Sequence, residues 1–244
     1  MLKALGGASP TIARPLGVSR RNPPRLISRV WLYGPTDGGT TPSRTVTTSV
    51  PAGATYLDAR AIGGGGGSDG STTKSGGGAA YARAGIAVSP RANVVSVISG
   101  QAANGSPGND GVDSTVSING VTFVKAAAGK AATAAHGAGG LSTDCIGTTI
   151  VAGTAGDGTQ GGPSGSDAAA RDPLNLGGYG RFDPATARDT SGASPPVLND
   201  IGSGGFPGST YVPALPTTTA WTTYDGRPGG AGIVVLEFWS KKPT

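Results

Sequence analysis

Alternating apolar and polar residues predict β-strands in two parts of the chain. The first part contains several short runs in which β-branched residues alternate with polar ones, as a pleated and half-buried surface favours. These runs cover residues 44–50, 55–62, 80–88 and 93–99. The second part is a single run, GIVVLEFW, at residues 232–239.

Residues 114–126, STVSINGVTFVKA, have the pattern of a β-hairpin. Two alternating runs flank the dipeptide Asn119-Gly120. Asn-Gly is a preferred pair for the type I′ turn, because both central residues of that turn have positive φ. The sequence therefore predicts a tight hairpin centred on this pair.

No run of the chain has the apolar stripe of an amphipathic helix. The alanine-rich segment AAAGKAATAAHGA, residues 126–138, is interrupted by Gly129 and has no apolar face. We therefore expect an all-β fold, a small β-sandwich-like scaffold with long glycine-rich loops and little or no helix.

Glycine is the most informative residue of the chain, with 45 positions among 244. Residues 127–230 show little apolar periodicity, yet an unstructured connection of that length is uncommon within one domain. In several places glycine recurs at every third position. These places are Gly64, Gly67 and Gly70; Gly105, Gly108 and Gly111; Gly153, Gly156, Gly162 and Gly165; Gly202, Gly205 and Gly208; and Gly226, Gly229 and Gly232.

This spacing has two interpretations. A polyproline II helix has three residues per turn and no internal hydrogen bonds, so glycine at every third residue leaves one face without side chains. Such faces can approach closely and bond backbone to backbone, as in polyglycine II packing. The other interpretation is chance in a glycine-rich chain, together with ordinary turns. The sequence alone leaves both open.

The densest glycine stretch, AIGGGGGSDGSTTKSGGG at 61–78, lacks the signatures of a nucleotide site. Thr73 precedes Lys74-Ser75 where a phosphate-binding loop requires glycine, and neither that loop nor a dinucleotide fold has the helix it needs. The calcium nonapeptide pattern occurs once, without a tandem repeat. We expect a loop that packs against other glycine-rich segments through Gly64, Gly67 and Gly70, with Asp69 and Lys74 in solvent.

Positive charge is concentrated at the N-terminus, although the whole chain carries only +5. Residues 1–30 hold six bases and no acid, whereas residues 31–244 hold 13 bases and 14 acids. Four prolines between residues 10 and 24 exclude one long helix there. We expect residues 1–40 to be an attachment arm that orders against a partner, the alternative being a solvated tail. Trp31 and Tyr33 either contact that partner or begin the first strand of the body. Residues 41–244 are then a glycine-rich β domain with a loop-rich insertion at about 127–230.

The residues that usually carry catalysis are scarce. The chain has one histidine, His136, one cysteine, Cys145, and one glutamate, Glu237. There is no Gly-x-Ser-x-Gly motif, and a zinc site needs about four ligands. A pair of aspartates is the remaining catalytic option, but the thirteen aspartates lie mostly in turn-like contexts, where Asx turns are common. We therefore expect no enzymatic activity, no cofactor and no metal site.

Four further classes of protein do not fit the sequence. A single cysteine allows no intramolecular disulfide, and no apolar run approaches the roughly 20 residues of a membrane span. The N-terminus lacks the apolar core of a secretory signal peptide, so synthesis and folding in a cytoplasm are expected. The body also lacks a basic face with interleaved aromatic residues, so no specific nucleic-acid binding is expected.

Six aromatic residues of the second half lie outside any strand pattern. Aromatic rings on loops present a rigid contact surface at low entropic cost. Alternatively, they fill a small core beneath the long loops. The six are Tyr179, Phe182, Phe206, Tyr211, Trp221 and Tyr224.

Four segments in order resemble a known family. They are SVPAGATYLDARAIGGGGG (49–67), SGGGAAYARAGIAVSP (75–90), NVVSVISG (93–100) and GRPGGAGIVVLEFW (226–239). In order and spacing, residues 46–239 resemble the glycine-rich domain of bacteriophage tail fibre, tail-tip and related virion proteins. The long segment 137–230, richer in Pro, Asp and Thr, and the basic arm depart from that family.

The resemblance implies a non-enzymatic virion protein, often a homotrimer, made in the host cytoplasm. Such a protein contacts other virion subunits and, at the distal end of a fibre or tail, a host receptor such as a glycan or an outer-membrane protein. The six aromatic residues above are then candidates for host contact. The candidates for virion attachment are Arg14, Arg20, Arg21, Arg25, Arg29 and Trp31.

Other functions fit the same features. One is a capsid decoration or head-fibre protein attached through the same arm. Another is an extracellular glycine-rich structural or ice-binding protein, and a third is an enzyme that degrades host glycans.

Overall fold

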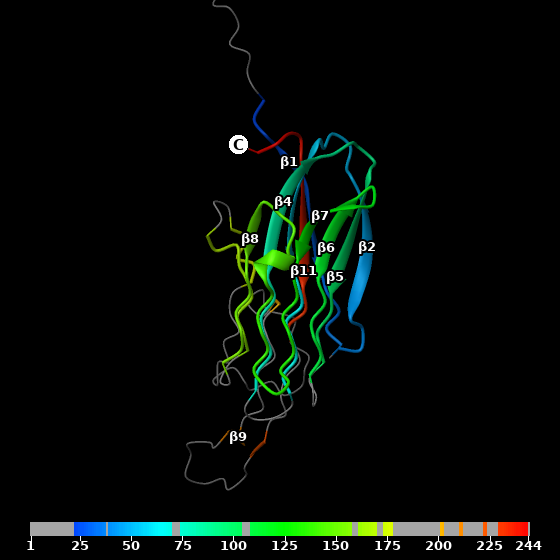
Figure 1. Ribbon diagram of the computed structural model, residues 1–244. Helices are drawn as coiled ribbons and strands as arrows, with labels where there is room; N and C mark the ends of the chain where they lie inside the picture. The colour runs from blue at the N-terminus through cyan, green and yellow to red at the C-terminus, as the bar shows by residue number, and fades with distance from the viewer. Residues whose placement is uncertain are drawn as a thin grey trace, which may run out of the picture.

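The computed structural model describes residues 22–37, 39–69, 74–103, 108–157, 161–169, 173–177, 201–202, 210–211, 222–223 and 229–243. Two antiparallel sheets face each other in a sandwich, as the sequence predicts (Figure 1). The only helical turn among these residues is the 3₁₀ turn η1, Ser142–Asp144. The fold is therefore all-β.

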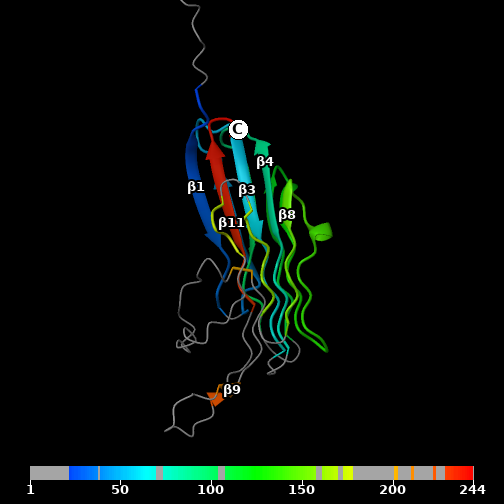
Figure 2. The same cartoon turned by 90° about the vertical axis from the view of Figure 1, so that its left-hand side faces the viewer.

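The larger sheet has five strands in the order β1-β11-β3-β4-β8 (Figure 2). Its strands are β1 Leu26–Tyr33, β11 Ile233–Trp239, β3 Tyr56–Ile62, β4 Tyr81–Ala87 and β8 Thr149–Val151. The smaller sheet has the order β2-β5-β6-β7. Its strands are β2 Ser43–Ser49, β5 Asn93–Ser99, β6 Ser114–Ile118 and β7 Val121–Ala126. Two short strands, β9 Thr210–Tyr211 and β10 Thr222–Thr223, pair with each other.

The strands expected from the apolar pattern are confirmed to within about a residue at each end. The hairpin is confirmed too, because Asn119 and Gly120 join β6 to β7 with φ of 51° and 77°. Both values are positive, as a type I′ turn requires.

Strand β1 corrects the expected boundary of the arm. Residues 26–33 were expected to belong to the attachment arm, but they pair along their length with β11. Val30 and Leu32 pack against the core between the sheets, while Arg29 points to the opposite face. The folded body therefore begins by Leu26, and this strand carries apolar residues on both faces because both faces of the sheet are covered.

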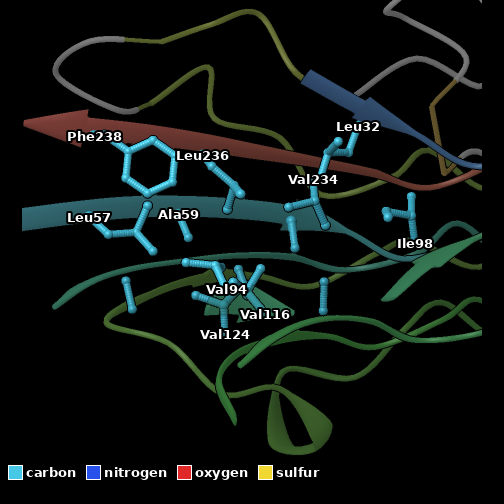
Figure 3. Packing of buried hydrophobic residues seen from close by; sticks show 14 of the residues in the cluster. Leu32, Leu57, Ala59, Val94, Ile98, Val116, Val124, Val234, Leu236 and Phe238 are labelled. Carbon is cyan, nitrogen blue, oxygen red and sulfur yellow. The ribbon is translucent and has the colours of Figure 1, made fainter. Parts of the chain in front are cut away.

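The core between the two sheets is built from few large side chains (Figure 3). Leu57 and Ala59 of β3 and Leu236 and Phe238 of β11 are fully buried against Val94 and its neighbours in the smaller sheet. Alternate residues of each strand supply these side chains, because successive residues point to opposite faces. Burial of each large apolar side chain contributes about 1.5–3 kcal/mol.

The outer face of the five-stranded sheet is also buried, and it carries a chain of ion pairs. Glu237 is 1% exposed and accepts a hydrogen bond from Arg29 Nε at 2.6 Å. Arg60, also 1% exposed, donates from Nη2 to the other oxygen of Glu237 at 3.4 Å. Its Nη1 lies 3.8 Å from Asp167 Oδ2. The register places Arg29 opposite Glu237 on neighbouring strands, so these charges meet through strand pairing.

Asp167 connects this ionic cluster to the segment that covers it. Its carboxylate accepts the backbone N–H groups of Leu174 and Leu176 at 2.6 and 2.8 Å. Leu176 then packs on Ile62 and Tyr81, and burial raises the pKa of the Tyr81 phenol well above its usual value. Glu237, the sole glutamate of the chain, therefore belongs to a buried network that joins the sheet to the segment covering it.

We expect Glu237→Gln to lower the free energy of unfolding by about 3 kcal/mol, because the buried Arg60 loses an ionised partner. Urea unfolding measures this loss. Lys130→Gln is the matched control. It breaks the ion pair between Lys130 and Asp110, in which the lysine side chain is 60% exposed and the aspartate side chain 52% exposed. This change should cost less than about 1 kcal/mol. Equal losses in both variants would contradict a structural role for the buried cluster.

Candidate functional site: the glycine-rich bundle

Beyond one end of the sandwich, the chain continues as extended segments that lie side by side (Figures 1 and 2). Most of them lead directly into or out of a strand of one of the two sheets. We call this array the glycine-rich bundle. Its segments are residues 63–69, 74–80, 108–113, 127–132, 137–140, 152–157, 161–165 and 229–232.

The first segment bonds to its neighbours with a period of three residues. In this segment, the N–H groups of residues 63–67 all donate to carbonyl oxygens of other segments. The acceptors, in order, are Ala80, Val112, Gly230, Gly77 and Asn109. N–H groups three residues apart therefore donate to the same neighbouring segment. This is expected for a helix with three residues per turn and no internal hydrogen bonds.

Segment 127–132 repeats this period, with two aspartates as acceptors. Gly129 and Ala132 donate to carbonyls of segment 63–67, whereas Ala128 and Ala131 donate to side chains. Those acceptors are the carboxylates of Asp113 and Asp110, at 2.9 and 2.8 Å. The two aspartates are three residues apart, so they replace backbone carbonyls at matching positions. The sequence interpretation missed this role, although their spacing matches that of the glycines.

Segment 74–80 lies at the centre of the bundle and bonds to six neighbours. Its N–H groups and carbonyls reach every side of the segment. The neighbours are residues 63–66, 127–130, 137–140, 154, 162–165 and 202. Bonding to this many neighbours brings several backbones close to the central segment.

Glycine is required in the bundle because neighbouring backbones lie too close for a Cβ atom, and not because φ is positive. A Cβ atom added at Gly66 would lie 1.9 Å from the carbonyl oxygen of Lys130, and one at Gly76 would lie 1.9 Å from that of Gly66. Neither glycine has positive φ. Gly64 and Gly67, for which the sequence predicts backbone neighbours, donate to Val112 and Asn109. Gly70 lies outside the described residues.

The expectation that Asp69 is solvated is wrong. Asp69 is 8% exposed, and Lys74 Nζ lies 3.8 Å from its carboxylate. The lysine side chain itself is 35% exposed. The pair lies where residues 63–69 and 74–80 run side by side, so close packing of the two segments covers the aspartate.

The lone histidine and cysteine both bond to backbone of the bundle. His136 Nδ1 accepts a hydrogen bond from the N–H of Ser75 at 3.4 Å. Cys145 Sγ accepts from Ala127 N and donates to the carbonyl of Leu141. Burial raises the pKa of the Cys145 thiol, which favours its protonated form. Across the described ranges, no cluster of three or more His, Cys, Asp or Glu could hold a metal ion.

Only part of the expected attachment set lies in the described structure. Arg25 is exposed, and its backbone exchanges hydrogen bonds with Ser240. Arg29 pairs with Glu237, and the half-buried Trp31 packs on the outer-face cluster, so both have partners inside the body. Arg14, Arg20 and Arg21 lie outside the described residues.

The expected host-contact residues lie almost wholly outside the described part of the chain. Tyr211 is in β9, which pairs with β10. The structure therefore does not bring these aromatic residues together into a described surface. Those outside it are Tyr179, Phe182, Phe206, Trp221 and Tyr224.

The two ends of the described molecule differ in construction (Figure 1). Residues 22–25, which lead in from the basic arm, lie at the end opposite the bundle. The strands connect there through short turns, whereas at the other end they continue into the bundle. No helix among the described residues is long and apolar enough to cross a membrane.

No protein-family model matches this chain, and no curated protein matches it. The function is therefore proposed from the sequence and the geometry of the two ends.

Replacing Gly66 by alanine should destabilise the bundle strongly, because the new methyl group overlaps the backbone of Lys130. We expect a loss of at least about 2 kcal/mol in the free energy of unfolding, measured with urea. Gly120→Asn is the matched control. Gly120 has no neighbour within 4 Å, and asparagine tolerates its positive φ, so the change should be less than about 1 kcal/mol. A Gly66→Ala variant as stable as the control would contradict close backbone packing.

Alkylation of Cys145 by iodoacetamide tests its raised thiol pKa. Because only the thiolate reacts, the pH at which the rate is half-maximal should be higher for the folded protein than for the urea-unfolded protein. A Cys145→Ser variant controls for reaction elsewhere. Coincident pH profiles for the two states would contradict the raised pKa.

Proposed function

We propose that this protein is a non-enzymatic bacteriophage virion protein, a tail fibre or tail-tip adhesin. It attaches to another virion subunit through its N-terminal arm and contacts a host-surface receptor at the glycine-rich end. The resemblance of residues 46–239 to the glycine-rich domain of such proteins raised this hypothesis. A homo-oligomer, with a trimer favoured, is part of the proposal.

One observation carries the proposal: the chain enters the body at one end, and the glycine-rich bundle forms the other (Figure 1). An adhesin needs this separation, because its anchor and its receptor-binding surface must face opposite partners. The bundle also suits a contact role mechanically. Its segments bond to one another through backbone groups, so the connections between them can vary in sequence while the packed segments hold their ends in place.

The chemistry of the described residues is consistent with a binding role. His136 and Cys145 serve the backbone of the bundle, and Glu237 is buried in an ionic cluster. These three residues were the scarce catalytic types of the sequence. Each has a structural use that does not need a substrate.

Deletion of residues 1–21 tests the arm. The deletion must stop before Leu26, because β1 belongs to the five-stranded sheet. The shortened protein should keep the urea-unfolding midpoint of the full chain but be missing from purified particles when it replaces the full chain during infection. Incorporation at the normal level would refute the anchoring role of the arm.

The purified full chain should bind cells of the host strain and slow phage adsorption when added in excess. The deleted protein should do both equally well, because it keeps the glycine-rich end. Particle incorporation without any binding to host cells would instead favour a capsid decoration role. Release of reducing sugar ends from host glycan would contradict the non-enzymatic assignment.

A further inference from the structure

The end of the body from which the arm leaves is basic, and its basic residues come from distant parts of the sequence. Five described segments meet at this end, which we call the arm end (Figure 1). They are residues 22–25, 50–55, 88–92, 119–120 and 240–243. Together they carry Arg25, Arg91, Lys241 and Lys242 and contain no aspartate or glutamate.

Hydrogen bonds connect four of these five segments. Arg25 and Ser240 bond in both directions, and Ser240 O accepts from the hydroxyl of Thr55 at 2.7 Å. The carbonyl of Thr55 accepts from Val88 N, and Arg91 N donates to Val50 O. The four basic residues therefore sit on a single connected framework.

The folded body carries its excess of positive charge at the arm end. From residue 22 onward the chain has 15 bases and 14 acids, which is +1. Removing the four bases of the arm end leaves 11 bases and 14 acids, or −3. The net positive charge of the protein therefore belongs to the arm and to the end of the body beside it.

Arg91 has an unfavourable backbone conformation in one of the turns of the arm end. Ala92 N donates to Ser89 O, which closes the turn Ser89-Pro90-Arg91-Ala92, and Arg91 has φ of 66°. Proline followed by a residue with positive φ is the pattern of a type II turn, in which glycine or asparagine is preferred at the third position. An arginine there costs stability, and strain of this kind is common where a side chain serves a function.

We propose that the arm end is a docking surface for an acidic protein patch, and that Arg25, Arg91, Lys241 and Lys242 bind its carboxylates. This inference rests on the proposed function, since the patch would belong to the virion subunit that receives the arm. The planar guanidinium of Arg91 suits paired hydrogen bonds to a carboxylate. A protein patch fits better than a nucleic acid, because the proposed function places the arm against another virion subunit.

Binding to immobilised poly-L-glutamate tests the surface without knowledge of the virion partner. The full chain is compared with a variant carrying Arg91→Asn, Lys241→Gln and Lys242→Gln. The control carries Arg44→Gln, Lys74→Gln and Lys130→Gln, which remove the same charge away from the arm end. In low salt, the first variant should bind about tenfold more weakly than the full chain, and the control should bind nearly as well as the full chain.

Equal loss in the two variants would overturn the proposal, because net charge and not the arm end would then explain binding. Tighter binding of the full chain to duplex DNA than to poly-L-glutamate at the same salt would overturn the choice of partner. The single variant Arg91→Asn adds an independent measurement. It should raise the urea-unfolding midpoint while weakening binding to poly-L-glutamate, and a lower midpoint would contradict strain at this position.

Incorporation of the same variants into particles separates this inference from the proposed function. If the arm-end variant loses poly-L-glutamate binding and also fails to enter particles, both are supported. If it loses poly-L-glutamate binding but enters particles normally, the docking role is refuted and the virion assignment stands. If the full chain itself is absent from purified particles, the virion assignment fails.

Discussion

Close approach of peptide backbones is the constraint on which the rest of this structure depends. In the bundle, one extended segment bonds to six others, and a single Cβ atom at Gly66 or Gly76 would overlap a neighbouring carbonyl. The bonds repeat every three residues, so each segment can satisfy neighbours on several sides. This arrangement lets a chain with only 5% aromatic residues form an ordered unit beyond its small apolar core.

The sandwich and the bundle support each other. Strands β3, β4, β6, β7 and β11 continue directly into bundle segments, so the register of the two sheets fixes where those segments begin. The bundle in turn ties together connections that would otherwise be long loops with unpaired backbone groups. On the outer face of the larger sheet, Arg60 and Glu237 are buried beneath a segment held by Asp167. Backbone bonding and a buried ionic cluster thus stabilise regions that few large apolar side chains reach.

The sequence predicted the strands well because their residues alternate, and Asn119-Gly120 specified its hairpin through local turn chemistry. It left open whether Trp31 and Tyr33 begin a strand, because β1 is apolar on both faces and follows a basic, proline-rich stretch. It did not reveal β8, which is only three residues long. The period of three in glycine pointed to backbone packing but not to which segments pair, because that depends on contacts between distant residues. Asp110 and Asp113 escaped notice for the same reason. Much of the candidate contact surface lies outside the described residues, so the sequence alone supports those positions.

The proposed function depends on the orientation of this molecule on a particle, and a reconstruction of purified virions measures it directly. The arm end, with residues 22–25 and 240–243, should face another virion subunit, and the glycine-rich bundle should point away from the particle. A map in which the bundle is buried against the particle and the arm end faces solvent would contradict the proposal.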